Sequence, residues 1–106
     1  MVKTILTGAG FVEGKTFKET MFLKPPKETY AVYHDSFERR GADNYNLITE
    51  HDYTLELYSY KADKSAESKI ETEFNNHGIE YEKESRYWLQ DEQLYQVIYT
   101  FNFIEK

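Results

Sequence analysis

Cysteine is absent from this chain of 106 residues, and proline occurs only twice. Without cysteine the protein has no disulfide scaffold, no thiolate zinc site and no cysteine nucleophile. Long apolar runs are also missing: no stretch approaches the length of a membrane span, and residues 1–10 lack the apolar run of a signal peptide. We therefore expect a protein that is made in a cytoplasm and does not enter a membrane.

Basic residues are scarce relative to acidic ones, and the net charge is −6. Residues 1–40 contain seven basic and five acidic residues, whereas residues 41–106 contain six and fourteen. Nucleic-acid binding over a broad surface is disfavoured, because neutralising phosphates needs a basic face. A mildly basic first part and an acidic remainder suit head-to-tail contacts between copies, although an ordinary soluble acidic surface explains the same distribution.

Aromatic residues are abundant, with ten Tyr and seven Phe. The last part of the chain, Leu94 to Ile104, alternates with a period of two, which predicts a strand with one packed face. The residues on that face are Tyr95, Val97, Tyr99, Phe101 and Phe103. A helical period would scatter these side chains around the whole cylinder, and their bulk needs a cover from the rest of the chain.

The fold class expected for this single domain, 1–106, is α+β. It consists of an antiparallel sheet of about four strands, with one main helix and a short N-terminal helix packed on it. The strands are expected at approximately 29–37, 48–60, 79–89 and 94–104, the main helix at approximately 64–77, and the short helix at 2–6 before Gly8 and Gly10. Asp63 is a good N-cap for the main helix. Gly78 is expected to end that helix in a Schellman motif, with Ile79 contacting Phe74.

Residues that could carry chemistry do not form a familiar set. His34, His51 and His77 lie in different elements without metal-ligand spacing. Glu80, Glu82 and Glu84 share a strand face, which fits a metal or acid/base site but fits the charged edge of a sheet better. We therefore expect no catalytic residue, no metal and no cofactor.

Contacts with other molecules are expected at a loop and on the second face of the sheet. The segment from Arg39 to Asn46 contains turn-forming residues and reads as an exposed connection. The second face is expected to keep surplus aromatic surface, from Tyr30, Tyr58, Tyr60 or Trp88. The candidate contact residues are Arg39, Arg40, Asp43, Asn44, Tyr45, Asn46, Tyr58 and Tyr60.

From Tyr30 onward, nearly 80 residues resemble, in order, a family of small proteins encoded by tailed bacteriophages and by prophages of Gram-positive bacteria. This family is related to tail-completion and tail-terminator proteins, which act in head-tail joining. The matching pieces are Pro25-Pro26, Tyr30-Ala31-Val32-Tyr33, Gly41-Ala42-Asp43 with Asn46, Glu50-His51, Leu55-Glu56-Leu57-Tyr58, Gly78-Ile79-Glu80-Tyr81, Leu94-Tyr95-Gln96, Tyr99 and Phe101. The chain departs from the family in its first helix, which Gly8 and Gly10 cut short.

The resemblance implies a virion protein without enzymatic activity, located in the tail or neck. Such a protein forms a ring of identical subunits, usually six, and contacts tail-tube or head-connector proteins; the family fold is α+β. The alternative from another class is a small acidic binding protein that inhibits or neutralises a host protein. An enzyme that uses Glu80, Glu82 and Glu84 with His51 ranks third.

Overall fold

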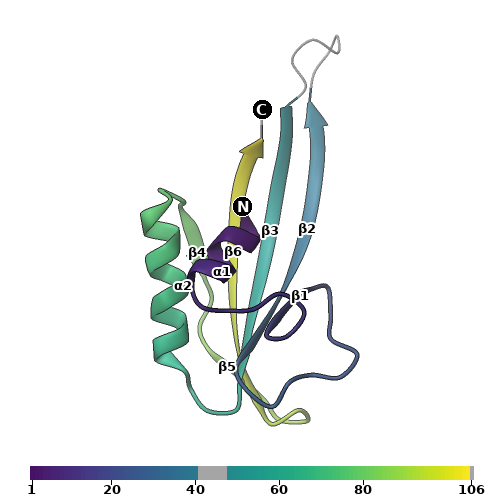
Figure 1. Cartoon of the computed structure of the whole chain (residues 1–106), viewed down its shortest axis with the longest axis vertical. Helices are drawn as coiled ribbons and strands as arrows, with labels where there is room; N and C mark the ends of the chain where they lie inside the picture. Colours follow the sequence, from purple (N-terminus) through teal and green to yellow (C-terminus); the bar gives the residue numbers. More distant parts are fainter. Residues whose placement is uncertain (41–47, 106) are drawn as a thin grey trace.

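The protein is an elongated sheet with both helices on one of its faces (Figure 1). The computed structural model describes residues 1–40 and 48–105, and the side chains of residues 1–36 and 50–103. The molecule measures 49 × 29 × 24 Å along its principal axes. Its elements are α1 (Val2–Gly8), β1 (Phe17–Glu19), β2 (Tyr30–Arg40), β3 (Ile48–Ser59), α2 (Lys64–Asn76), β4 (Tyr81–Lys83), β5 (Tyr87–Leu89) and β6 (Leu94–Glu105).

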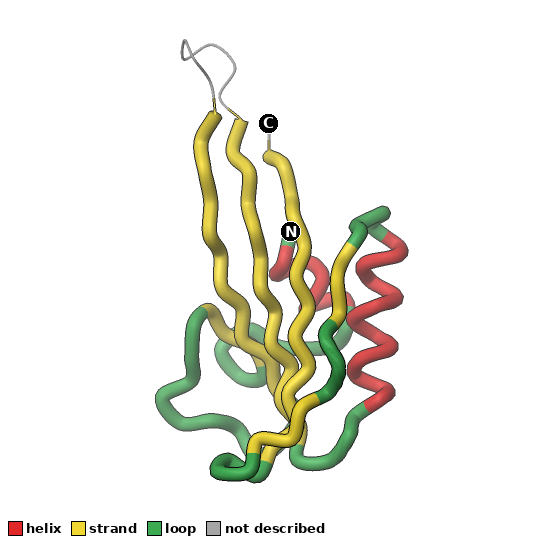
Figure 2. The backbone as a smooth tube through the Cα atoms, turned by 180° about the vertical axis from the view of Figure 1, so that it is seen from behind, coloured by secondary structure: helices red, strands yellow, loops and turns green. Residues whose placement is uncertain are grey.

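The sheet has six strands, in the order β1-β2-β3-β6-β4, and β5 also pairs with β6. Three long strands form its centre: β3 pairs antiparallel with β2 on one side and with β6 on the other, over eleven residue pairs each. β1 pairs with β2 in parallel, opposite Ala31, Val32 and Tyr33 only. β4 covers β6 only opposite Tyr99, Thr100 and Phe101. The upper part of the three long strands therefore stands clear of both helices, as the view from behind also shows (Figure 2).

The core lies between the sheet and the two helices. β6 contributes the alternating side chains expected from its sequence, with Val97, Tyr99 and Phe101 at most 5% exposed. From α2, Ile70 and Phe74 pack on them and are completely buried. Full burial of side chains of this size stabilises a fold by roughly 1.5–3 kcal/mol each. These contacts hold α2 against the sheet.

The expected four-stranded antiparallel sheet with one main helix is wrong. The described residues form six strands and two helices, and the first strand pairs in parallel. β1 escapes sequence analysis because three residues are too few to show a period. It forms because Phe17, which is 1% exposed, anchors the segment in the core.

The strand expected at 79–89 is interrupted between Lys83 and Tyr87. Lys83 lies opposite Tyr99, whereas Tyr87 lies opposite Gln96, so three residues of this segment face two residues of β6. This is a β-bulge, which bends the strand and changes the side of the sheet on which the following side chains lie. The bulge divides the segment into β4 and β5.

The helix expected at 64–77 is present as α2. Asp63 caps it by accepting a hydrogen bond from Ala66 N–H at 3.0 Å. At the other end Gly78 N–H donates to Asn75 O and Ile79 N–H donates to Phe74 O, which is the expected Schellman motif. Among the described residues, neither helix is long and apolar enough to cross a membrane.

Candidate functional site

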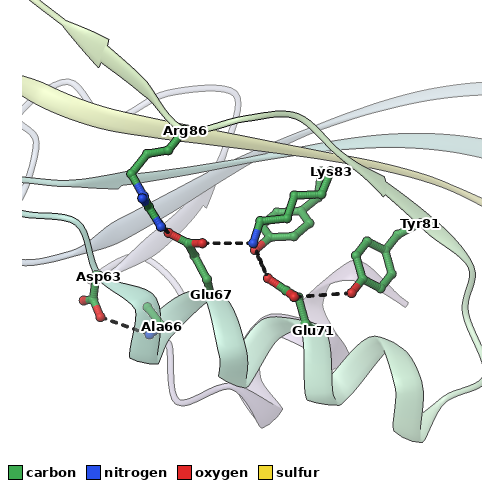
Figure 3. Close-up of polar contacts among 8 residues, drawn as sticks. Asp63, Ala66, Glu67, Glu71, Tyr81, Lys83 and Arg86 are labelled. Atoms are coloured by element: carbon green, nitrogen blue, oxygen red, sulfur yellow. Dashed lines mark hydrogen bonds and ion pairs between the residues drawn. The ribbon is translucent and has the colours of Figure 1, made fainter.

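The densest polar cluster in the described part of the chain lies between α2 and the edge of the sheet (Figure 3). Its centre is the carboxylate of Glu67, a residue only 5% exposed. Arg86 donates from Nε and Nη2 to Glu67 Oε2, at 3.0 and 2.7 Å, and Lys83 Nζ lies 3.0 Å from Oε1. Both oxygens of this buried carboxylate are therefore paired with cations.

The β-bulge explains why two cations three positions apart reach the same carboxylate. In an uninterrupted strand, Lys83 and Arg86 would lie on opposite faces of the sheet. The extra residue in the bulge puts both on the face that carries α2. Glu67 and Glu71, one turn apart on α2, meet them there.

The second half of the cluster is centred on Glu71. Its Oε2 accepts hydrogen bonds from Lys83 Nζ at 2.8 Å and from the hydroxyl of Tyr99 at 2.7 Å, and its Oε1 accepts from Tyr81 at 3.5 Å. Burial alone would raise the pKa of the Glu71 carboxyl, but the hydrogen bonds from Lys83 and Tyr99 lower it overall. Burial and the hydrogen bond to Glu71 raise the pKa of Tyr99 far above its usual value, so its hydroxyl stays a donor.

The chemistry of this cluster favours a structural role. An acid/base catalyst needs a pKa near the working pH and a path to its substrate. Here the tyrosine pKa is raised, the carboxylate pKa is lowered, and Tyr99 is fully buried. No buried polar side-chain atom within the described part of the chain lacks a hydrogen-bond partner. The cluster fastens α2 to the sheet, and sequence analysis missed it, although the spacing of Glu67 and Glu71 beside the apolar stripe of the helix was a usable signal.

The histidines do not assemble a site. His51 Nδ1 lies 2.9 Å from Asp35 on the neighbouring strand, and the imidazole stacks on Tyr53. His34 lies 3.6 Å from Glu56 on the other face of the sheet, and His77 lies 3.8 Å from Glu73. Sequence analysis missed the pairing of His51 with Asp35, because it needs the register between β2 and β3.

The carboxylates at 80, 82 and 84 do not form a metal site either. Glu82 alone lies within β4, opposite Thr100 and on the face of the sheet away from the helices, here called the outer face. Among the described residues, no group of three His, Asp or Glu side chains could hold a metal ion. The other interpretation of these carboxylates, as the charged edge of a sheet, fits the position of β4, which is the last strand on that side.

Two stretches of unpaired strand edge are the other candidate. β1 covers the edge of β2 only as far as Tyr33, and β4 covers the edge of β6 only as far as Phe101. Beyond these points the ribbon of β2, β3 and β6 continues with no strand on either side, as far as the described residues reach. We call these stretches the β2 edge (residues 34–40) and the β6 edge (residues 102–105).

A groove of about 920 Å³ adjoins the β6 edge. The residues that line it come from the end of α2, the start of β4 and the middle of β3 and β6. Its apolar lining includes Ile79, Tyr81 and Phe103, and its carboxylates are those of Asp52, Glu80 and Glu82.

The expected contact residues are only partly described. Arg39 and Arg40 belong to β2, opposite Thr49 and Ile48, so placing them in a loop was wrong. The long antiparallel pairing with β3 extends the strand past the expected end. The other expected loop contacts, Asp43, Asn44, Tyr45 and Asn46, lie outside the described residues.

The aromatic side chains of the second face are less available than expected. Tyr30 is only 6% exposed, because Phe22 packs edge-on against it and Tyr58 stacks on it at 5.2 Å. Tyr60 is 47% exposed and donates to Pro26 O. Trp88 is 45% exposed but lies opposite Tyr95, on the face that carries the helices. The outer face therefore does not present the aromatic patch that was expected.

No protein-family model matches this sequence, and no curated protein does. The likeness to phage tail proteins therefore remains a hypothesis, and no family membership follows for this chain.

Proposed function

We propose that this chain is a non-enzymatic assembly protein that joins identical copies into a ring at the end of a phage tail or at the head-tail junction. The observation that carries the proposal is the central ribbon, which ends in unpaired edges on opposite sides. Proteins normally cover or blunt such edges, because exposed backbone groups pair with other chains. Unpaired strand edges therefore suit a protein that assembles by strand pairing with other chains.

The location in a virion rests on the ordered resemblance from Tyr30 onward, and so do the ring of six and the partners in the tail tube or head connector. The family fold is a sheet with helices packed against it, and this chain is also mostly sheet, with helices on one face. The edges support self-association independently of the resemblance. The two arguments can therefore fail separately.

The test is to delete the gene from the phage genome that carries it and to examine the particles by electron microscopy. We expect heads and tails that fail to join, or tails of abnormal length, and rescue by a plasmid copy of the gene. Normal, infectious virions from the deletion strain would contradict the proposal.

A second candidate, an acidic protein that neutralises a host protein, is favoured by the outer face of the sheet. On β2, β3, β6 and β4 this face carries Glu50, Asp52, Glu56 and Glu82, and none of its described side chains there is Lys or Arg. A carboxylate face attracts a partner with a basic surface. A one-to-one complex with a host protein, recovered by pull-down from infected cells, would favour this candidate. Recovery of tail components alone would exclude it.

A further inference from the structure

We propose that the loop formed by residues 23–27 of one copy binds in the groove beside the β6 edge of a second copy. This inference rests on the proposed function, because it names a contact through which identical copies would join. The 23–27 loop projects from the side of the sheet opposite α2, whereas the groove lies beside the end of α2 and the start of β4 (Figures 1 and 2). A contact between these two sides is heterologous and can repeat around a closed ring.

The 23–27 loop presents an apolar side chain and two lysines to solvent. Leu23 is 88% exposed, the largest value among the large apolar side chains that the structure describes. Met21, two residues earlier, is 55% exposed. Lys24 and Lys27 are exposed as well, and neither forms an ion pair within the described residues. The loop therefore carries apolar surface and positive charge side by side.

Contacts at both ends restrain this loop. At its start, the ring of Phe22 packs edge-on against Tyr30, with the ring centroids 5.5 Å apart. Near its end, the Tyr60 hydroxyl donates a hydrogen bond to Pro26 O at 3.1 Å. Pro25 and Pro26 restrict the backbone further, because each proline fixes its own φ. A segment restrained in this way loses less conformational entropy when it binds.

The apolar part of the groove suits Leu23. Ile79, Tyr81 and Phe103 line it and are only partly buried, although they also pack against the core. The groove volume of about 920 Å³ lies within the range of small-ligand sites, so it accommodates the side chains of a short segment. A leucine that enters it removes apolar surface from water on both sides of the contact, which favours association.

The rest of the groove is acidic. Its carboxylates are those of Asp52, Glu80 and Glu82, and its described lining contains no lysine or arginine. Glu80 and Glu82 are exposed and form no ion pair with any residue that the structure describes. Glu67 and Glu71, in contrast, each have a cation from their own chain. The carboxylates of the groove are thus available to a cation from another molecule.

Lys24 and Lys27 supply such cations next to Leu23. Opposite charges across an interface steer two partners together and fix their register, whereas like charges repel. A two-fold contact between two grooves would bring two sets of carboxylates together. The loop of a second copy is therefore a better occupant of the groove than a second groove.

Charge reversal tests the contact from both sides. The loop variant, Lys24→Glu with Lys27→Glu, has an acidic loop and an acidic groove. The groove variant, Glu80→Lys with Glu82→Lys, has a basic loop and a mainly basic groove. All four positions are exposed, so both variants should fold, which circular dichroism checks. In analytical ultracentrifugation we expect the wild type to form oligomers as its concentration rises, and each variant alone to stay monomeric.

An equimolar mixture of the loop variant and the groove variant should assemble again. Every acidic loop then meets a basic groove, and every basic loop meets an acidic groove. Lys15→Glu with Lys18→Glu, at exposed positions outside the loop, changes the net charge by the same amount as the loop variant and should assemble like the wild type. Assembly by either charge-reversed variant alone would overturn the proposal. So would a mixture of folded variants that stays monomeric, or a wild type that is monomeric at the highest concentration at which it is soluble.

A single substitution covers the case in which a charge-reversed variant does not fold. Leu23→Ser changes a side chain that is 88% exposed, so it should fold and should weaken assembly by at least about tenfold. Val12→Ser, at another exposed apolar position, is the matched control and should leave assembly unchanged. Equal assembly by both variants would contradict the proposal. If the loop variant rescued the deletion phage, the proposed function would stand and only this contact would be lost.

Discussion

Glu67 is a carboxylate almost completely removed from solvent, and its cations make that burial possible. An isolated charge in such a place costs several kcal/mol, and the group would normally become protonated instead. Arg86 and Lys83 together pair both of its oxygens, and Lys83 is shared with Glu71. The side chain of Arg86 is 27% exposed, so solvent screens part of its interaction. We therefore expect the loss of either Arg86 or Lys83 to destabilise the protein, because Glu67 would keep only one cation.

Replacing Arg86 with Met should destabilise the protein by on the order of 2 kcal/mol, because Glu67 would keep only one cation. The measurement is the free energy of unfolding from urea denaturation. Lys18→Met, at an exposed position of β1, is the control and should change the free energy by less than about 0.5 kcal/mol. Equal effects of the two variants would show that the cluster does not fasten α2.

Asp63 makes the stability of α2 depend on pH. The hydrogen bond from Thr29, at 2.7 Å, and then the one from Ala66 N–H lower the pKa of this carboxyl. A group whose pKa is lower in the folded state stabilises the protein above its unfolded pKa, roughly 3.9. That contribution is lost as the pH falls through the folded value.

We therefore expect Asp63→Asn to keep most of the stability at pH 7, since Asn is an equally good N-cap, but to lose less stability than the wild type between pH 5 and pH 2. Urea denaturation across that range gives the measurement. Asp63→Ala is the control, and should cost about 1 kcal/mol already at pH 7. If the free energy of unfolding of Asp63→Asn fell as steeply between pH 5 and pH 2 as that of the wild type, Asp63 would not be the source of this pH dependence.

Both helices end in the same way. In α1, Gly10 N–H donates to Thr7 O and Phe11 N–H donates to Leu6 O, which repeats the pattern found after α2. Gly10 and Gly78 both have positive φ, +97° and +66°. The two Schellman motifs turn the chain away from each helix, and they direct Phe11 and Ile79 back toward the core. Gly8, in contrast, is the last residue of α1 and does not stop it.

Gly78→Ala should destabilise the protein by about 1 kcal/mol. No heavy atom lies within 4 Å of the added Cβ, so the cost comes from the left-handed backbone alone. Gly78→Asn should cost less, because Asn tolerates this conformation. Asn76→Ala, at the last position of α2, is the control and should be neutral or slightly stabilising. Thermal unfolding measures all three, and a neutral Gly78→Ala would contradict the argument.

The accuracy of sequence-based prediction differed between elements for identifiable reasons. The packed face of β6 and both ends of α2 follow from local rules, and the structure confirms them. β1 depends on one anchor, Phe17, and the bulge before Tyr87 depends on the register with β6, so neither has a local signal. The pairing of His51 with Asp35 was missed for the same reason, because it joins two strands whose alignment appears only after folding. In the Glu67 cluster the spacing of Glu67 and Glu71 on α2 was a usable signal, but their partners Lys83 and Arg86 depend on the bulge.

At the scale of the whole molecule, the protein has a base and a projection. In the base, helices cover one face of the sheet, and extra strands cover the edges of β2 and β6. The projection is the rest of the three-stranded ribbon, standing clear of both helices (Figure 2). Local stability follows buried contacts and paired backbone groups, so it should fall from the base to the projection. Pairing with a second copy would supply what the projection lacks.

Amide hydrogen exchange along β6 should reveal this difference residue by residue. In dilute monomeric protein, the outward amide of Ile104, which lies beyond the pairing with β4, should exchange quickly. The amides of Phe101 and Phe103 point toward β3, which should protect them and makes them internal controls. If copies join through the β6 edge, the exchange of Ile104 should slow to the rate of its neighbours at concentrations at which the protein assembles, because a second copy supplies its missing acceptor. NMR spectra at the two concentrations give the comparison, and unchanged exchange of this amide in the assembled protein would exclude the β6 edge as the contact.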